Sequence, residues 1–154
     1  MNQKDFNPDG INRDYVKSDL ESGIVIKLHV KDTTPPKEKR FIIVGITEDR
    51  LILATVYINS EINLKVNWAV ELKEQHLFFE SKGRSWLDWD SYVDCSKITP
   101  RDHNEIESAI KLRPEAIIGK LSHEDLEVIK QKISSSPTIK GKHKKKFGFY
   151  KKMT

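Results

Sequence analysis

The sequence predicts an α+β fold, in which a small curled β-barrel is followed by helices that pack on it. Between residues 23 and 96, short apolar runs alternate with turn-forming residues at short intervals, as expected for strands that close into a small barrel. Residues 99–134 instead carry apolar side chains at helical spacing behind capping residues. Strands first and helices afterwards are typical of a segregated α+β domain.

The first half of the chain has the clearest strand patterns. Residues 23–30 alternate large aliphatic side chains with mostly polar ones, which predicts a strand with one buried face. Residues 32–39 contain two adjacent prolines and predict a stiff, extended loop. Residues 41–46 form an unbroken apolar run, which predicts a strand that is buried on both faces or central in the sheet. A turn at 48–50 leads to the next predicted strand, 51–59.

The strand signals weaken further along the chain. Residues 61–66 and 69–72 predict two marginal strands, and residues 75–80 predict another. A turn follows at 81–84, and residues 90–96 form the last strand that we predict.

Two helices are expected after the strands. Thr99 is a suitable N-cap residue, with Pro100 at the first helical position and Asp102 at the third, and the helix should end near Arg113. The second helix is expected from His123 to Ser134.

Ser122 marks the start of this second helix, because its hydroxyl can accept a hydrogen bond from the free N–H groups of the first turn. Leu126, Ile129 and Ile133 recur on one face of the helix and need a covering surface.

The 154 residues suggest one domain with extensions. Residues 1–22 form an N-terminal extension with a short helix at 11–22, and residues 23–137 form the barrel domain. Residues 138–154 form a basic tail that the composition predicts to be disordered. Seven lysines and no acidic residue lie between residues 140 and 154, so the formal net charge of +4 describes the tail rather than the domain.

Several classes of protein are disfavoured by the composition. A single cysteine, Cys95, cannot form a disulfide within the chain and fits a reducing cytoplasm; alternation predicts that it is a buried small side chain. The first ten residues are polar, and the apolar stretches are too short to span a bilayer, so we expect a cytoplasmic protein without a membrane partner. The histidines are scattered without metal-ligand spacing, so neither a metal site nor a cofactor is expected.

Four short motifs follow one another along the chain in a characteristic order. The first strand opens with Gly-Ile-Val-Ile, and a basic residue precedes the next strand in Lys39-Arg40-Phe41-Ile-Ile-Val. A later strand ends in Ile58-Asn59-Ser60, and Ile118-Gly-Lys-Leu-Ser122 leads into the last helix. This order resembles the MazF/PemK family (CcdB/PemK superfamily) of toxins from bacterial type II toxin–antitoxin systems. The resemblance covers about residues 23–133.

The resemblance implies an SH3-like curled β-barrel that forms a homodimer and binds an antitoxin protein in its RNA groove. It also implies an endoribonuclease that cleaves single-stranded RNA without a metal ion. By the same resemblance Arg40 stands at the position of the catalytic arginine, whose forked guanidinium suits a phosphate group. Asn59 stands where the family commonly has threonine, and Ser60 keeps a hydroxyl beside it. The alternative function is a non-catalytic nucleic-acid-binding or protein-interaction module on the same barrel.

Further basic and aromatic residues suggest contacts with RNA outside the catalytic positions. Lys37 and Lys39 lie at the basic end of the predicted loop. The segment Trp86-Leu-Asp-Trp89 lies beside Lys82 and Arg84, and aromatic rings beside cations suit base stacking on a single strand. Alternatively, the tryptophans, Trp68 included, fill the barrel ends or a dimer seam. In the tail, Lys144, Lys145 and Lys146 would contact phosphates; alternatively, the tail is a solubilising extension.

Overall fold

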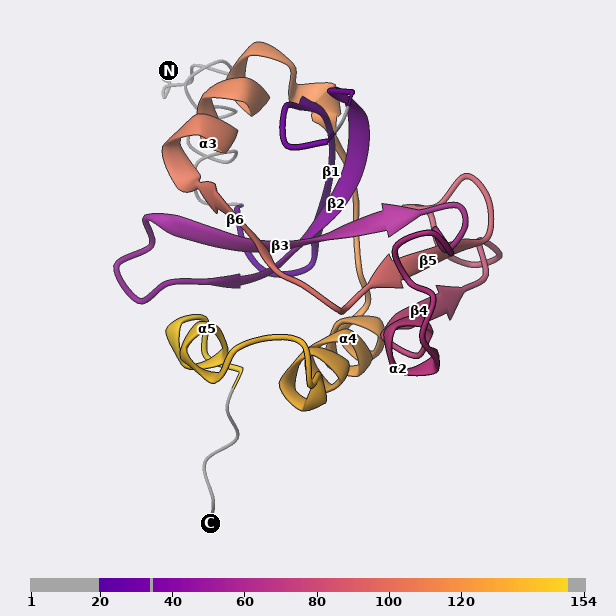
Figure 1. Cartoon of the computed structure of the whole chain (residues 1–154). Helices are drawn as coiled ribbons and strands as arrows, with labels where there is room; N and C mark the ends of the chain where they lie inside the picture. The colour runs from indigo at the N-terminus through magenta and orange to yellow at the C-terminus, as the bar shows by residue number, and fades with distance from the viewer. Residues whose placement is uncertain (1–19, 34, 150–154) are drawn as a thin grey trace, which may run out of the picture.

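A computed structural model describes residues 20–33 and 35–149 (Figure 1). Its strands are β1 (Ile24–Val30), β2 (Lys37–Ile46), β3 (Ile52–Asn59), β4 (His76–Phe79), β5 (Ser91–Asp94), β6 (Thr99–Asp102) and β7 (Ile117–Lys120). They form one sheet in the order β4-β5-β3-β2-β1-β7, and β6 pairs with β3 beside this path. Every pairing is antiparallel.

The helices lie on the two faces of this curled sheet. They are α2 (Val70–Lys73), α3 (His103–Leu112), the 3-10 turn η1 (Pro114–Ala116), α4 (His123–Ser135) and α5 (Gly141–Lys146). Figure 1 shows α3 on one side of β2 and β3, and α4 and α5 on the opposite side. The architecture is therefore α+β with a curled antiparallel half-barrel, which confirms the coarse fold that the sequence predicts.

Each face of the sheet has its own core. Phe41 and Ile43 of β2 pack on the α3 side with Ile106 and Ile110. Ile42 of β2 packs on the other side, in a cluster that includes residues from α4 and the C-terminal segment. Because successive strand residues point to opposite faces, the unbroken apolar run at 41–46 fills both cores, as the sequence predicts.

Helix α4 begins where the sequence predicts. The Ser122 side chain accepts a hydrogen bond from the backbone N–H of Asp125 at 3.1 Å. Ile129 and Ile133 of the predicted stripe are fully buried against the sheet. The helix runs one residue beyond the predicted end, to Ser135.

The predicted capping motif at Thr99 is wrong. Residues 99–102 form β6, which pairs with residues 52–55 of β3. Asp102 is the actual N-cap of α3, and its side chain accepts from the N–H of Glu105 at 3.1 Å. Pro100 is tolerated because, among the described residues, β6 pairs with β3 only. The N–H that proline lacks is therefore not needed for hydrogen bonds to a second neighbouring strand.

Other segments also differ from the predictions. Residues 61–69 contain no strand, because Asn63 organises a turn in which its carbonyl accepts from the N–H of Asn67 at 2.9 Å. The second weak strand is instead the short helix α2. Strand β2 begins at Lys37, within the predicted loop, and β7 is a strand that the sequence pattern does not reveal. The helix predicted at 11–22 lies almost wholly outside the described residues.

Within the described residues the lysine-rich segment is part of the folded domain, so the predicted disorder is wrong for residues 138–149. Phe147 and Phe149 are buried, with 6% and 5% of their surface exposed. They pack over Gly45 of β2, where an added Cβ would lie 3.2 Å from the Phe149 ring. Ser134 of α4 donates a hydrogen bond to the Phe149 carbonyl oxygen at 2.7 Å. Apolar anchors therefore outweigh the local composition here.

Candidate functional site

A pocket of about 670 Å³ opens where β2 begins and β3 ends. Five residues that the sequence singles out line it together: Lys37, Lys39, Arg40, Asn59 and Ser60. Antiparallel pairing explains the convergence, because Arg40 lies opposite Ile58 in the β2–β3 register. The family resemblance implies a joint role for Arg40, Asn59 and Ser60, and the structure brings them to one pocket, whose other walls the sequence did not identify.

Arg40 is a charged side chain of the pocket with a donor left unsatisfied. Its Nη1 atom is buried and has no hydrogen-bond acceptor among the described residues. Its guanidinium lies over the Trp89 ring, 4.8 Å from the ring centroid. Burial lowers the pKa of Arg40, and the nearby charge of Asp88 only partly offsets that effect. A half-buried cation with a free donor is suited to bind an anionic oxygen.

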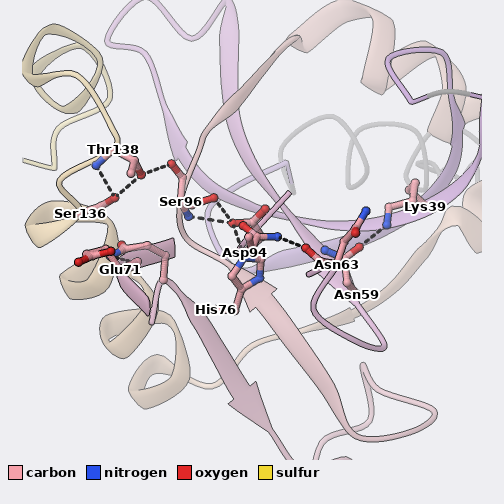
Figure 2. Close-up of polar contacts among 11 residues, drawn as sticks. Lys39, Asn59, Asn63, Glu71, His76, Asp94, Ser96, Ser136 and Thr138 are labelled. Atoms are coloured by element: carbon pink, nitrogen blue, oxygen red, sulfur yellow. Dashed lines mark hydrogen bonds and ion pairs between the residues drawn. The ribbon is translucent and has the colours of Figure 1, made fainter. Parts of the chain in front are cut away.

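Lys39 and Asn59 form a second polar group at the same edge. The Lys39 ammonium donates a hydrogen bond to Asn59 Oδ1, as Figure 2 shows, and lies 5.1 Å from the centroid of the Tyr57 ring. Burial lowers the pKa of Lys39, and the like charges of Lys37 and Arg40 lower it further. The cation therefore holds the amide side chain of Asn59 in place at the pocket wall.

A network behind the pocket ties the β1–β2 connection to the sheet. The Tyr57 hydroxyl donates to Asp32, and Arg101 of β6 donates to the Tyr57 oxygen at 2.6 Å. Burial opposes ionisation of Asp32, but the hydrogen bond from Tyr57 and the charge of Arg101 outweigh it and lower the pKa of Asp32. Burial, together with the hydrogen bond to Asp32, raises the pKa of Tyr57 to about 12.

His76 and Asp94 form a further pair that sequence reasoning missed. The His76 side chain is 2% exposed and lies with its Nε2 atom 3.7 Å from Asp94 Oδ1. Neither ring nitrogen has a hydrogen-bond partner among the described residues. Asp94 is oriented by Ser96, whose backbone N–H donates to the same carboxylate oxygen at 2.9 Å (Figure 2). No short-range motif could have revealed the pair, because it is formed across the β4–β5 register.

The charges that line the pocket are mixed in sign. Its cationic side chains are Lys27, Lys37, Lys39, Arg40 and Lys97. Its acidic side chains are Asp32, Glu38, Glu61, Asp88 and Asp94. Any attraction of the pocket for a polyanion must therefore come from how individual cations are placed rather than from a uniformly basic surface.

Lys82, Arg84 and Trp86 do not join this pocket but line a separate hollow beside α4. Arg84 donates two hydrogen bonds to the Asp125 carboxylate, at 2.8 and 3.0 Å, and its guanidinium lies over the Phe79 ring. Trp86 is 3% exposed and packs in the core, so its indole is not available for base stacking. The alternative interpretation of this tryptophan, that it fills the barrel, is the correct one.

The remaining predicted contacts, Lys144, Lys145 and Lys146, lie on α5 and do not line the pocket. Lys144 is partly used within the protein, since it donates to the Ser136 carbonyl oxygen at 2.8 Å. Cys95 is fully buried, as predicted, and burial raises the pKa of its thiol to about 12.

Two structural findings concern metals and membranes. Within residues 20–33 and 35–149, no group of three or more His, Cys, Asp or Glu side chains could hold a metal ion. In the same part of the chain, no helix combines the length and the apolar character that crossing a membrane requires.

Comparison with known proteins adds no assignment, since the sequence matches no protein-family model and no curated protein sequence. The resemblance to the MazF/PemK family therefore stays a prediction.

Proposed function

We propose that this chain is a MazF/PemK-like protein of the CcdB/PemK superfamily, with an SH3-like barrel whose pocket cleaves single-stranded RNA without a metal ion. The observation that carries the proposal is the state of Arg40: half-buried, stacked on Trp89 and left with an unpaired Nη1 donor beside Asn59 and Ser60. Leaving a buried donor unpaired costs about 1–3 kcal/mol, and an acceptor supplied by a substrate removes that cost.

In the proposed reaction the ribose 2′-hydroxyl attacks the adjacent phosphorus. The new O2′–P bond forms as the P–O5′ bond breaks, which gives a 2′,3′-cyclic phosphate and a 5′-hydroxyl end. Arg40 binds the phosphoryl oxygens, on which charge builds up in the transition state. Asn59 and Ser60 hydrogen-bond the same group.

Two protons must move in this reaction. The 2′-hydroxyl gives one proton to a pocket base, and the leaving O5′ gains one from the conjugate acid or from water. His76 and Asp94 are the paired acid–base groups of the pocket wall, and we assign proton transfer to them. The cytoplasmic location, the homodimer and the antitoxin partner belong to the same proposal.

The test is to incubate the purified protein with a long single-stranded RNA in EDTA and to map the cuts by primer extension. Discrete cuts are expected from the wild type and not from Arg40→Ala. Arg113→Ala is the matched control, because Arg113 is an exposed arginine that lies outside the pocket lining and pairs with Glu115. Equal cleavage by wild type and Arg40→Ala would contradict the proposal.

A second function, RNA binding without cleavage, is favoured by Asn59. An amide held by Lys39 replaces the hydroxyl that the family places at this position. Retention of RNA at low salt with no cuts in EDTA would support this second function. In that case Asn59→Thr is the variant with which to look for restored cleavage.

A further inference from the structure

We propose that Trp89 is the base-stacking platform of this pocket, which would make an unpaired nucleobase beside the Arg40-bound phosphate the recognised feature of the substrate. This inference rests on the proposed function and deepens it by naming the part of the RNA that the pocket recognises.

The first observation is the exposure of Trp89. Of the three tryptophans, Trp86 is buried, whereas Trp89 is 52% exposed and Trp68 is 74% exposed. Trp89 lines the pocket and Trp68 does not. A large aromatic surface left in water at the wall of a polar pocket has an energetic cost that stacking against another ring would relieve.

The second observation is that Trp89 is already held on one side. The Arg40 guanidinium lies 4.8 Å from its ring centroid, and this cation–π contact covers one face of the indole. Because the ring has two faces and 52% of the residue is exposed, we expect the opposite face to be open to a ligand. The same contact orients Arg40, so a base on the free face and a phosphate at Arg40 would belong to neighbouring positions of one strand.

The third observation is the apolar neighbour at the pocket wall. Val66 is 64% exposed and lines the same pocket as Trp89, from the loop after β3. Val66 and Trp89 therefore add exposed apolar surface from two different loops to a pocket that also carries cationic groups. Single-stranded nucleic acid presents this combination of a flat base and a charged backbone, whereas the bases of a duplex are stacked on one another and offer no free face.

The test uses a single-stranded 2′-O-methyl oligouridylate, which cannot be cleaved by attack of its 2′-oxygen. Its binding is followed by quenching of tryptophan fluorescence and by an independent affinity measurement with a labelled strand. We expect Trp89→Ala to weaken binding by about 5- to 150-fold, the range measured for losing one stacked base. Trp89→Phe should restore most of the affinity because it keeps an aromatic face, whereas Trp89→Leu should not.

Trp68→Phe is the matched control, because Trp68 is also exposed and lies outside the pocket lining. The wild type and Trp68→Phe should both show quenching on binding, and Trp89→Phe should bind without it. Circular dichroism of each variant establishes that it is folded.

Two further outcomes separate the inference from the proposed function. Binding that is equal in the wild type, Trp89→Ala and Trp89→Leu would overturn the stacking platform and leave the proposed function standing. Absence of binding by the wild type at low salt would overturn the proposed function itself. Equal affinity for the single strand and for a duplex of the same length would also overturn the platform.

Discussion

Two arginine–aromatic pairs in this protein have similar geometry but differ in how the arginine is hydrogen-bonded. Arg40 lies 4.8 Å from the centroid of Trp89, and Arg84 lies 4.9 Å from that of Phe79. Arg84 is held by two hydrogen bonds to the Asp125 carboxylate, whereas Arg40 has a buried Nη1 atom without an acceptor. The Arg84–Phe79 pair is therefore completed inside the protein, whereas the Arg40–Trp89 pair keeps a free donor, to which our proposal assigns the substrate phosphate.

The electrostatics of the two arginines follow the same division. The hydrogen bond to Asp125 raises the pKa of Arg84, although burial acts against it. Burial lowers the pKa of Arg40, and the nearby charge of Asp88 only partly offsets that effect. Their aromatic partners differ accordingly, since Phe79 is buried and Trp89 is 52% exposed. A cation beside an aromatic ring therefore indicates a binding site only when the cation still has a donor that no group of the protein accepts from.

The largest expected effect comes from Arg40→Ala. Cleavage should fall by about 10²–10³-fold, the usual cost of removing one donor that stabilises transition-state charge. The free energy of unfolding should change by no more than about 1 kcal/mol, since losing the contact with Trp89 is offset by removing a poorly hydrated charge. Rate measurements and urea unfolding of the same preparation test both parts. A large loss of stability would mean that Arg40 is structural, like Arg84.

The converse result is expected for Arg84→Ala. The free energy of unfolding should fall by about 1–3 kcal/mol, because the partly buried Asp125 carboxylate loses two charge-assisted hydrogen bonds. Cleavage per folded molecule should be unchanged. A double-mutant cycle with Asp125→Ala isolates the pair, and additive effects of the two substitutions would show that it contributes nothing.

A smaller effect is expected from the lysines of α5. Lys145→Ala with Lys146→Ala should weaken RNA binding and reduce the slope of log affinity against log salt by at most about 1.4, because each lost phosphate contact on a single strand contributes about 0.7. The cleavage rate with saturating RNA should not change, since neither lysine lines the pocket. An unchanged salt slope would assign α5 to solubility alone.

The smallest effect concerns the network behind the pocket. The pKa of Tyr57 is raised to about 12 from an ordinary value of 10.0, so the folded protein keeps this proton at a pH where the unfolded chain has lost it. The stabilisation by this group is therefore complete below pH 10.0 and is lost as the pH rises through 12. Ultraviolet titration of wild type and Tyr57→Phe should show one tyrosine that ionises late. A tyrosine that titrates with the others would contradict the hydrogen bond to Asp32.

Much of the fold could be predicted because its signals are local. The apolar run around Ile42 and Ile43 predicts a strand buried on both faces, and Ser122 predicts the start of α4. The segments that were missed depend on distant partners. Strand β6 exists because β3 pairs with it, and Phe149 is ordered by contact with β2 and α4.

The candidate site divides in the same way. The family resemblance assigns Arg40, Asn59 and Ser60 to one site, and the antiparallel β2–β3 pairing explains why they meet at one pocket. The sequence could not show that Arg84 is paired within the protein and lies outside the pocket, since its partner Asp125 is 41 residues away. His76 was missed for the same reason, because cross-strand pairing brings it to the pocket. The sequence offered Trp86 and Trp89 alike, and only packing shows that Trp89 is the one that lines the pocket.

The sequence by itself determined the class of fold, the strands of the central sheet, the capped helix and the basic and amide side chains at the β2–β3 edge. These features arise from periodicity, capping and turn chemistry, which act over a few residues. The tertiary structure alone decided which arginine is paired, which tryptophan is buried and how Phe147 and Phe149 of the lysine-rich segment pack on the sheet. Those outcomes depend on burial and on hydrogen-bond partners far along the chain, and only the packed core brings such partners together.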